Sequence, residues 1–161
     1  MEQLTEKQNV SLYVPADTGP AFWGPNDRYT FLVTGAQSDG AYFIMEALVP
    51  PGGGPPPHIH RREQESFYLL DGTLEIQMGD EVVQASTGDF VHIARGAVHC
   101  FRNPGDTTAR MLLIFSPGGI EGFFKDALAR VKDRSEKQPQ NMEVVVARYI
   151  EAAPRYGLEF V

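Results

Sequence analysis

Three histidines and one glutamate carry the most informative chemistry in this sequence. They are His58, His60, Glu65 and His99. Three imidazoles and one carboxylate make a ligand set suited to a divalent transition metal. A metal held by such a set keeps coordination positions open for substrate, water or dioxygen. These residues therefore predict a small metal-dependent protein, most simply an enzyme.

The spacing of the candidate ligands suggests how a β-strand would present them. Residues two apart on a strand point to the same face, so His58 and His60 can both face an interior. The preceding prolines, 55–57, favour an extended lead-in. Glu65 begins the next expected strand, and His99 comes from a distant one. We expect a polar cluster in an apolar cavity, with substrate contacts from Phe67, Leu69, Met78 and Phe101.

Strand signals dominate the middle of the chain. Segments rich in β-branched and aromatic residues, separated by Gly and Pro, occur at 29–33, 42–49, 66–70, 73–78, 82–85, 90–93, 98–102 and 110–115. Many short strands with such turns are typical of a sandwich or barrel. The turn Asp71–Gly72 predicts a β-hairpin between segments 66–70 and 73–78. Because the sequence shows no internal repeat, we expect one barrel.

The pattern changes to a helical one after residue 118. Apolar residues recur at helical spacing through 121–134, and a second helix is expected at 142–152, where Pro154 ends it. Residues 136–140 form a polar linker between the two. The last residues, 156–161, are apolar enough to pack back onto the domain.

Composition narrows the classes of partner. The 161 residues carry a net charge of -7, from 21 acidic and 14 basic residues. No basic stretch stands out, so we expect neither nucleic acid nor a membrane as partner, but a small-molecule substrate. The first residues are polar, and no apolar run reaches the length of a membrane span. The single cysteine, Cys100, cannot form an intrachain disulfide. These features favour a cytoplasmic protein.

Two segments resemble the motifs of a known family. The first, Gly52-x5-His58-x-His60-x4-Glu65-x6-Gly72, resembles the first cupin motif at every fixed position. The second, Gly88-x5-Ala94-x-Gly96-x2-His99-x3-Asn103, resembles the second cupin motif, with Ala94 in place of the family's proline. The resemblance implies that His58, His60, Glu65 and His99 are the metal ligands. It also implies an all-β fold, a single cupin (double-stranded β-helix, or jelly-roll) barrel with a C-terminal helical segment.

Further segments look like one group of cupins. The run 46–60 and the tail 155–160 are similar to small single-domain cupins of the quercetin 2,3-dioxygenase type. We therefore expect an N-terminal arm at 1–28, the cupin barrel at 29–118, and a C-terminal helix and tail packing on the barrel at 119–161. Cupins commonly pair through a sheet edge, which makes a homodimer the expected assembly.

The leading hypothesis for function is a metal-dependent dioxygenase of a small aromatic or enolic substrate, with flavonol ring cleavage as the first guess. Glu65 would then both bind the metal and take the substrate proton as the catalytic base. The alternatives are a non-catalytic cupin that binds a metal or small molecule, and a non-redox isomerase. The sequence leaves the metal open, because Fe, Mn, Ni, Co, Cu and Zn all accept this ligand set.

Three nearby residues have less specific interpretations. Glu63 could replace Glu65 as a ligand, although only Glu65 fits the spacing to both His60 and Gly72. His92 lies outside both motifs and is expected at the surface or hydrogen-bonded. Cys100 alternates with His99 and is expected to point away from the metal as a small buried side chain.

Overall fold

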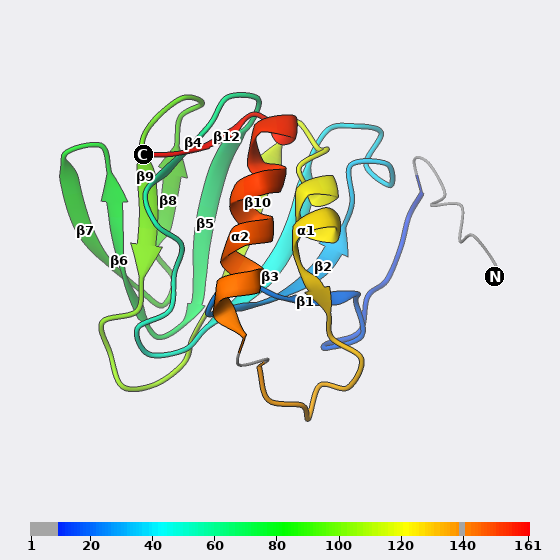
Figure 1. Cartoon of the computed structure of the whole chain (residues 1–161), viewed down its shortest axis with the longest axis horizontal. Helices are drawn as coiled ribbons and strands as arrows, with labels where there is room; N and C mark the ends of the chain where they lie inside the picture. Colours follow the sequence, from blue (N-terminus) through cyan, green and yellow to red (C-terminus); the bar gives the residue numbers. More distant parts are fainter. Residues whose placement is uncertain (1–9, 139–140) are drawn as a thin grey trace.

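The computed structural model describes residues 10–138 and 141–161. Residues 1–9 of the expected N-terminal arm and residues 139–140 of the expected linker lie outside the described residues. The described chain forms two antiparallel sheets, one of seven strands and one of five, with the helices α1 and α2 beside them (Figure 1). This confirms the expected all-β jelly-roll fold with a C-terminal helical segment.

The strand order in each sheet brings together segments that are distant in the sequence. The large sheet runs in the order β11 (Ala129–Arg130), β1 (Ala21–Trp23), β2 (Arg28–Val33), β3 (Phe43–Val49), β10 (Ala109–Ser116), β5 (Gln64–Asp71) and β8 (Phe90–Ile93). The small sheet runs in the order β12 (Leu158–Phe160), β4 (His58–His60), β9 (His99–Arg102), β6 (Thr73–Met78) and β7 (Glu81–Ser86).

The core lies between the two sheets. Along β3 and β10 buried and more exposed residues alternate, as expected of strands with one face against a core. The inward face supplies large side chains such as Phe43, Phe67 and Phe115, none of which is more than 1% exposed. Hydrophobic burial on this scale gives the rigid support that a metal cluster between the sheets needs.

The hairpin predicted at Asp71–Gly72 is wrong. β5 pairs with β10 and β8, whereas β6 pairs with β7 and β9, so the corner carries the chain from one sheet to the other. A two-residue hairpin turn of the Asp-Gly type needs positive φ at both residues, and here Gly72 alone of the two has it, at 86°. A side chain at Gly72 would also stand 3.0 Å from Ala109.

The C-terminal segment differs in part from its prediction. The first helix, α1, spans Glu121–Ala127 and ends earlier than expected, because Leu128 is extended and β11 pairs with the edge strand β1. The buried Leu128 and Val131, which suggested a longer helix, therefore lie on either side of the short strand β11. The second helix, α2, is confirmed at Met142–Ala152 and is followed by the 3-10 helix η1 (Ala153–Tyr156).

The two sheets extend beyond the expected barrel, 29–118, at both ends. β1 lies within the expected N-terminal arm, and β11 and β12 lie within the expected C-terminal segment. The tail packs back as β12, which pairs with β4, the strand that carries His58 and His60. The last residues of the chain thus become a wall of the candidate site.

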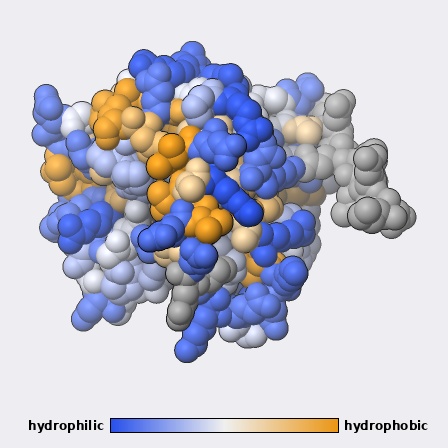
Figure 2. All heavy atoms as spheres, viewed as in Figure 1, coloured by the Kyte–Doolittle hydropathy of each residue, from blue (hydrophilic) through white to orange (hydrophobic). Residues whose placement is uncertain are grey.

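The outer face of α2 carries exposed apolar side chains. Figure 2 shows an apolar patch over this helix, where Val144, Val146 and Ile150 are each at least 40% exposed. Among the described residues, no helix has the length and apolar character needed to cross a membrane.

Candidate metal centre

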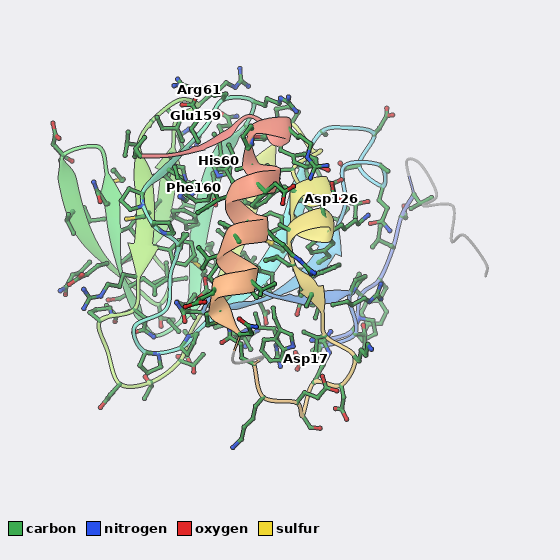
Figure 3. The ribbon with its side chains drawn as sticks, in the orientation of Figure 1. Asp17, His60, Arg61, Asp126, Glu159 and Phe160 are labelled. Carbon is green, nitrogen blue, oxygen red and sulfur yellow. The ribbon has the colours of Figure 1, made fainter. Side chains whose placement is uncertain are left out.

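The four candidate ligands meet between the two sheets. His58 and His99 face each other as a register pair of β4 and β9, while Glu65 comes from β5 in the large sheet. One ligand atom from each of the four residues lies within 4.8 Å of the others, and all four residues are buried. We call His58, His60, Glu65 and His99 the metal cluster. It lies behind α2, where Figure 3 labels His60.

The hydrogen bonds of the imidazoles orient them for a metal. The Nδ1 atoms of His58 and His99 lie 2.9 Å from the carbonyl oxygens of Pro56 and Ala97. Because a carbonyl only accepts, each Nδ1 donates, and each Nε2 is the atom that would present a lone pair to a metal. Without a metal, His99 Nε2 instead donates to the Glu65 carboxylate. The Nε2 atoms of His60 and His99 lie 3.1 Å and 2.7 Å from Glu65 Oε2. Nitrogen lone pairs and a carboxylate that converge in this way fit a divalent metal.

The pKa values within the cluster follow from burial and mutual contact. Burial, together with the neighbouring His99 and His60, lowers the pKa of His58 to about 3, which keeps it neutral. Burial would also lower the pKa of His60, but contacts with Glu63 and Glu65 raise it to about 9. Hydrogen bonds from His60 and His99 outweigh burial and hold the pKa of Glu65 well below its usual range. Metal binding would therefore displace a proton from His60.

Glu63, the alternative ligand, lies on the other side of His60. Its Oε2 is 3.6 Å from His60 Nδ1, whereas the metal cluster meets at Nε2. The side chain is 4% exposed, and neither Glu63 Oε2 nor His60 Nδ1 has a hydrogen bond of good geometry among the described residues. This geometry favours Glu65 as the ligand and places Glu63 where it can orient His60.

A mostly apolar cavity adjoins the metal cluster, with a clear interior of about 20 Å³. That interior holds about one water molecule and is far smaller than the usual small-molecule site, so a ring-shaped substrate must displace wall side chains. Three residues of the metal cluster line one part of the cavity, and mostly aromatic and apolar side chains line the rest. The lining residues are Tyr29, Met45, Pro55, His58, His60, Glu65, Phe101, Leu113, Phe115, Phe123, Phe124, Tyr149 and Leu158.

Comparisons with known proteins agree with this geometry. Residues 45–115 match the family described as "Cupin domain". This stretch resembles a cupin domain. In sequence the chain is similar to proteins of the quercetinase type, and its fold agrees with that of solved cupins.

Two curated relatives and one solved structure illustrate the likeness. The chain is 30% identical over 112 residues to quercetin 2,3-dioxygenase of Bacillus subtilis and 34% identical over 103 residues to that of Aspergillus japonicus. These matches cover 63% and 60% of this chain, but only 32% and 29% of those proteins. The chain therefore spans about a third of the length of these relatives.

The solved structure is a predicted oxalate decarboxylase from Thermotoga maritima. It matches with a TM-score of 0.60 and 20% identity, covering 66% of this chain and 99% of that one. At this level of identity the likeness concerns the fold.

The four residues predicted to contact substrate occupy different positions in the cupin. Phe101 lines the cavity. Phe67 lies behind it, with its ring 5.8 Å from that of Phe101 and 6.3 Å from that of His99. Met78 is the register partner of His99, and Leu69 is fully buried in the core. The structure thus brings Phe101 to the cavity surface, while Phe67 packs against it and Leu69 is part of the core.

The opposite wall of the cavity was not predicted from the sequence. It includes Tyr29 from β2, Phe123 and Phe124 from α1, Tyr149 from α2 and Leu158 from β12. The spacing of Tyr29 and Phe31 on their strand is a signal that both face inward. For the helical residues, the apolar spacing indicates burial but gives no information about which cavity they reach.

The remaining histidine and the cysteine lie where they were expected in outline. His92 is exposed, and its Nδ1 lies 3.0 Å from the Ser66 hydroxyl. Cys100 is partly buried, and its thiol donates to Gln77 Oε1 over 3.4 Å, away from the metal cluster. Neither residue enters the candidate site.

Proposed function

We propose that this cupin is a metal-dependent dioxygenase of a small aromatic or enolic substrate, with flavonols the leading class. The observation that carries the proposal is the convergence of histidine Nε2 atoms on the Glu65 carboxylate beside an apolar cavity. The likeness to two quercetin 2,3-dioxygenases supports the choice of substrate class.

Each part of the site has a role in this proposal. A divalent transition metal bound by the cluster would supply Lewis acidity to an enol oxygen and a path for electrons to dioxygen. The backbone carbonyls of Pro56 and Ala97 hold two imidazoles in the ligating orientation. The aromatic side chains, among them Phe101, Phe115 and Phe123, exclude water and stack against a planar substrate. Within the metal cluster, Glu65 is the proposed base that takes the substrate proton.

The test is dioxygen consumption with quercetin. Protein purified without oxygen would be reconstituted separately with Fe, Mn, Ni, Co, Cu and Zn, and a His99→Ala variant would serve as control. We expect uptake with at least one redox-active metal and its loss in the variant. No uptake with any metal would remove the flavonol proposal.

A non-redox reaction or simple binding is the second candidate. It is favoured by the water-sized interior of the cavity, which suits a substrate smaller than a flavonol. Turnover of an enolisable substrate without oxygen would support an isomerase. Tight retention of zinc and of a ligand without turnover would support a binding protein.

Assembly and location are further parts of the proposal. We propose a homodimer, supported by one edge strand of each sheet, β7 and β8, which carry the exposed Val82 and Phe90. A monodisperse monomer in light scattering would contradict it.

We also propose a cytoplasmic location, supported by the free thiol of Cys100, and cell fractionation would test it.

A further inference from the structure

A buried carboxyl and a buried phenol form a pair in the wall of the cavity, apart from the metal cluster. Tyr29 on β2 lines the cavity, and its hydroxyl donates to Asp27 Oδ2 over 2.8 Å. Both residues are only 2% exposed. The Tyr29 ring is held by an edge-on contact with Phe124 and by the close approach of Gly24, where a side chain would stand 2.6 Å from the ring.

Burying the Asp27 carboxyl is energetically unfavourable, and the fold supplies few groups that offset this cost. Its Oδ1 has no hydrogen bond of good geometry among the described residues, although the Gly54 amide approaches the carboxyl. Within residues 10–138 and 141–161, no ion pair involves Asp27. A side chain at Gly53 would come within 2.7 Å of that oxygen, so the glycine makes room for it. A buried polar group with so few partners indicates a role other than stability.

The electrostatics suit a proton acceptor at neutral pH. Burial raises the pKa of Asp27 to about 7, against the opposing effect of the Tyr29 hydroxyl and the Gly54 amide. Burial also raises the pKa of Tyr29 well above its usual value, and Asp27, Tyr149 and Glu65 act in the same direction. Tyr29 therefore stays neutral, while Asp27 can bind or release a proton near pH 7.

We propose that Tyr29 is a catalytic residue that takes the hydroxyl proton of an enolic or phenolic substrate while its own proton passes to Asp27, the positioning residue behind it. The substrate O–H bond breaks and leaves its electron pair on the substrate oxygen, as a new O–H bond forms at Tyr29. The original O–H bond of Tyr29 breaks, and a new one forms at Asp27 Oδ2. The phenol thus ends neutral, and the carboxylate ends protonated.

This inference rests on the proposed function for its enolic substrate class, but it assigns the substrate proton to Tyr29 in place of Glu65. The proton transfer itself needs no dioxygen. It can therefore be measured with zinc, which takes part in no redox step. The ionised form of an enol or catechol absorbs at longer wavelength than the neutral form. The protonation state of a bound probe is thus visible without any turnover.

The experiment measures ionisation of bound quercetin and bound 4-nitrocatechol by absorbance between pH 5 and pH 9 on zinc-loaded protein. The variants are Tyr29→Phe and Asp27→Asn, which keep the shape of each side chain. The matched control is Tyr156→Phe, because Tyr156 donates in the same way to Asp126 but lies outside the cavity. Zinc content and folded state would be verified for every protein.

We expect the wild-type protein and Tyr156→Phe to ionise the bound probes alike. In Tyr29→Phe and Asp27→Asn the midpoint of ionisation should rise by at least about one pH unit, a tenfold loss in the ionisation equilibrium. Midpoints equal to wild type in both variants would overturn the proposal. So would a wild-type protein that neither binds nor ionises either probe.

The result separates this inference from the proposed function. A shifted midpoint in the two variants, without oxygen uptake by any metal form, would keep the proton relay and remove the dioxygenase. Oxygen uptake with unshifted midpoints would keep the dioxygenase and remove the relay.

Discussion

The two walls of the cavity are built in different ways. The metal wall comes from neighbouring strands β4 and β9 and from β5 across the barrel, so sheet register places its ligands. The aromatic wall comes from β2, α1, α2 and β12, elements that meet only through packing. The first wall determines what can be bound by coordination. The second determines which molecule fits beside it.

The difference also appears in the polar groups. In the metal wall, the Nδ1 atoms of His58 and His99 each bond a backbone carbonyl. In the aromatic wall, Asp27 has an oxygen without a partner. The metal wall also holds two buried atoms without a hydrogen bond, His60 Nδ1 and Glu63 Oε2, but these face each other at 3.6 Å. Among the described residues Asp27 is in no ion pair, and such a buried carboxyl lowers stability and indicates function. The following predictions test whether the two walls can be separated experimentally.

The largest effect is expected from His99→Ala. Removing one imidazole from the metal cluster should weaken metal binding by more than about 100-fold. The loss of a residue that only hydrogen-bonds a ligand typically costs about 10–100-fold. Titration of the metal-free protein with Zn²⁺ or Co²⁺ measures it. Because His92 lies outside the cluster and is exposed, His92→Ala is the control and should bind as wild type. Equal affinities in the two variants would contradict the assignment of the cluster.

Phe123→Ala tests the aromatic wall. Phe123 is 1% exposed and packs its ring against Phe124 and Tyr149. The variant should lose about 3–5 kcal/mol in the free energy of unfolding, because a large cavity replaces a buried ring. Denaturant unfolding measures it, with the exposed Val144→Ala on α2 as control. If metal affinity fell as much as in His99→Ala, the two walls would not be separable.

Asp27→Asn should change how stability depends on pH. The folded-state pKa of about 7 exceeds the ordinary aspartate pKa of 3.8, so the wild-type protein loses stability as pH rises from about 4 to about 7. Asparagine does not ionise, so the variant should be more stable than wild type at pH 8, by up to a few kcal/mol. Unfolding curves at pH 4, 6 and 8 measure the difference. If the free energy of unfolding changed with pH in the same way in both proteins, ionisation of Asp27 would not destabilise the fold.

Glu63→Gln distinguishes an orienting residue from a ligand. As a residue behind His60, Glu63 should contribute about 10–100-fold to metal affinity. The same metal titration measures it, beside Glu65→Gln, in which a ligand is lost. A loss from Glu63→Gln as large as that from Glu65→Gln would make Glu63 the ligand.

The smallest effect is expected at the ion pair of Arg61 and Glu159. Figure 3 shows the two side chains together at the edge of the molecule, near His60 and Phe160. Arg61 Nη2 lies 2.7 Å from Glu159 Oε2, with both side chains at least half exposed. Glu159→Gln should leave the melting temperature and the metal affinity unchanged within error, because exposed ion pairs contribute little. A clear loss of metal affinity would show that this pair holds β12 against β4.

Local sequence was sufficient for most strands and for naming the candidate ligands. The alternation of β3 and β10 follows from polar and apolar spacing, and the His58–x–His60 spacing places two imidazoles on one face. The helix at Met142–Ala152 was likewise predicted from its spacing and from Pro154. These features depend on neighbours within a few residues, which the sequence shows directly.

Local sequence failed where the partner of a segment decided its structure. Leu128 to Val131 has helical spacing, yet it becomes extended because β1 offers an unpaired edge. Asp71–Gly72 has the composition of a hairpin turn, yet the strands on either side find their partners in different sheets. In both cases long-range pairing overrode a weak local preference.

The sequence by itself determined the all-β class and the metal cluster, since periodicity and motif spacing are local properties of the chain. Only the tertiary structure decided which residues face that cluster. Tyr29, Phe123, Tyr149 and Leu158 are distant in sequence and share one cavity. The physical reason is that non-directional apolar packing brings them together, and such contacts depend on the whole fold. The pairing of Asp27 with Tyr29 is local in sequence, but its burial beside a cavity is a property of the folded chain.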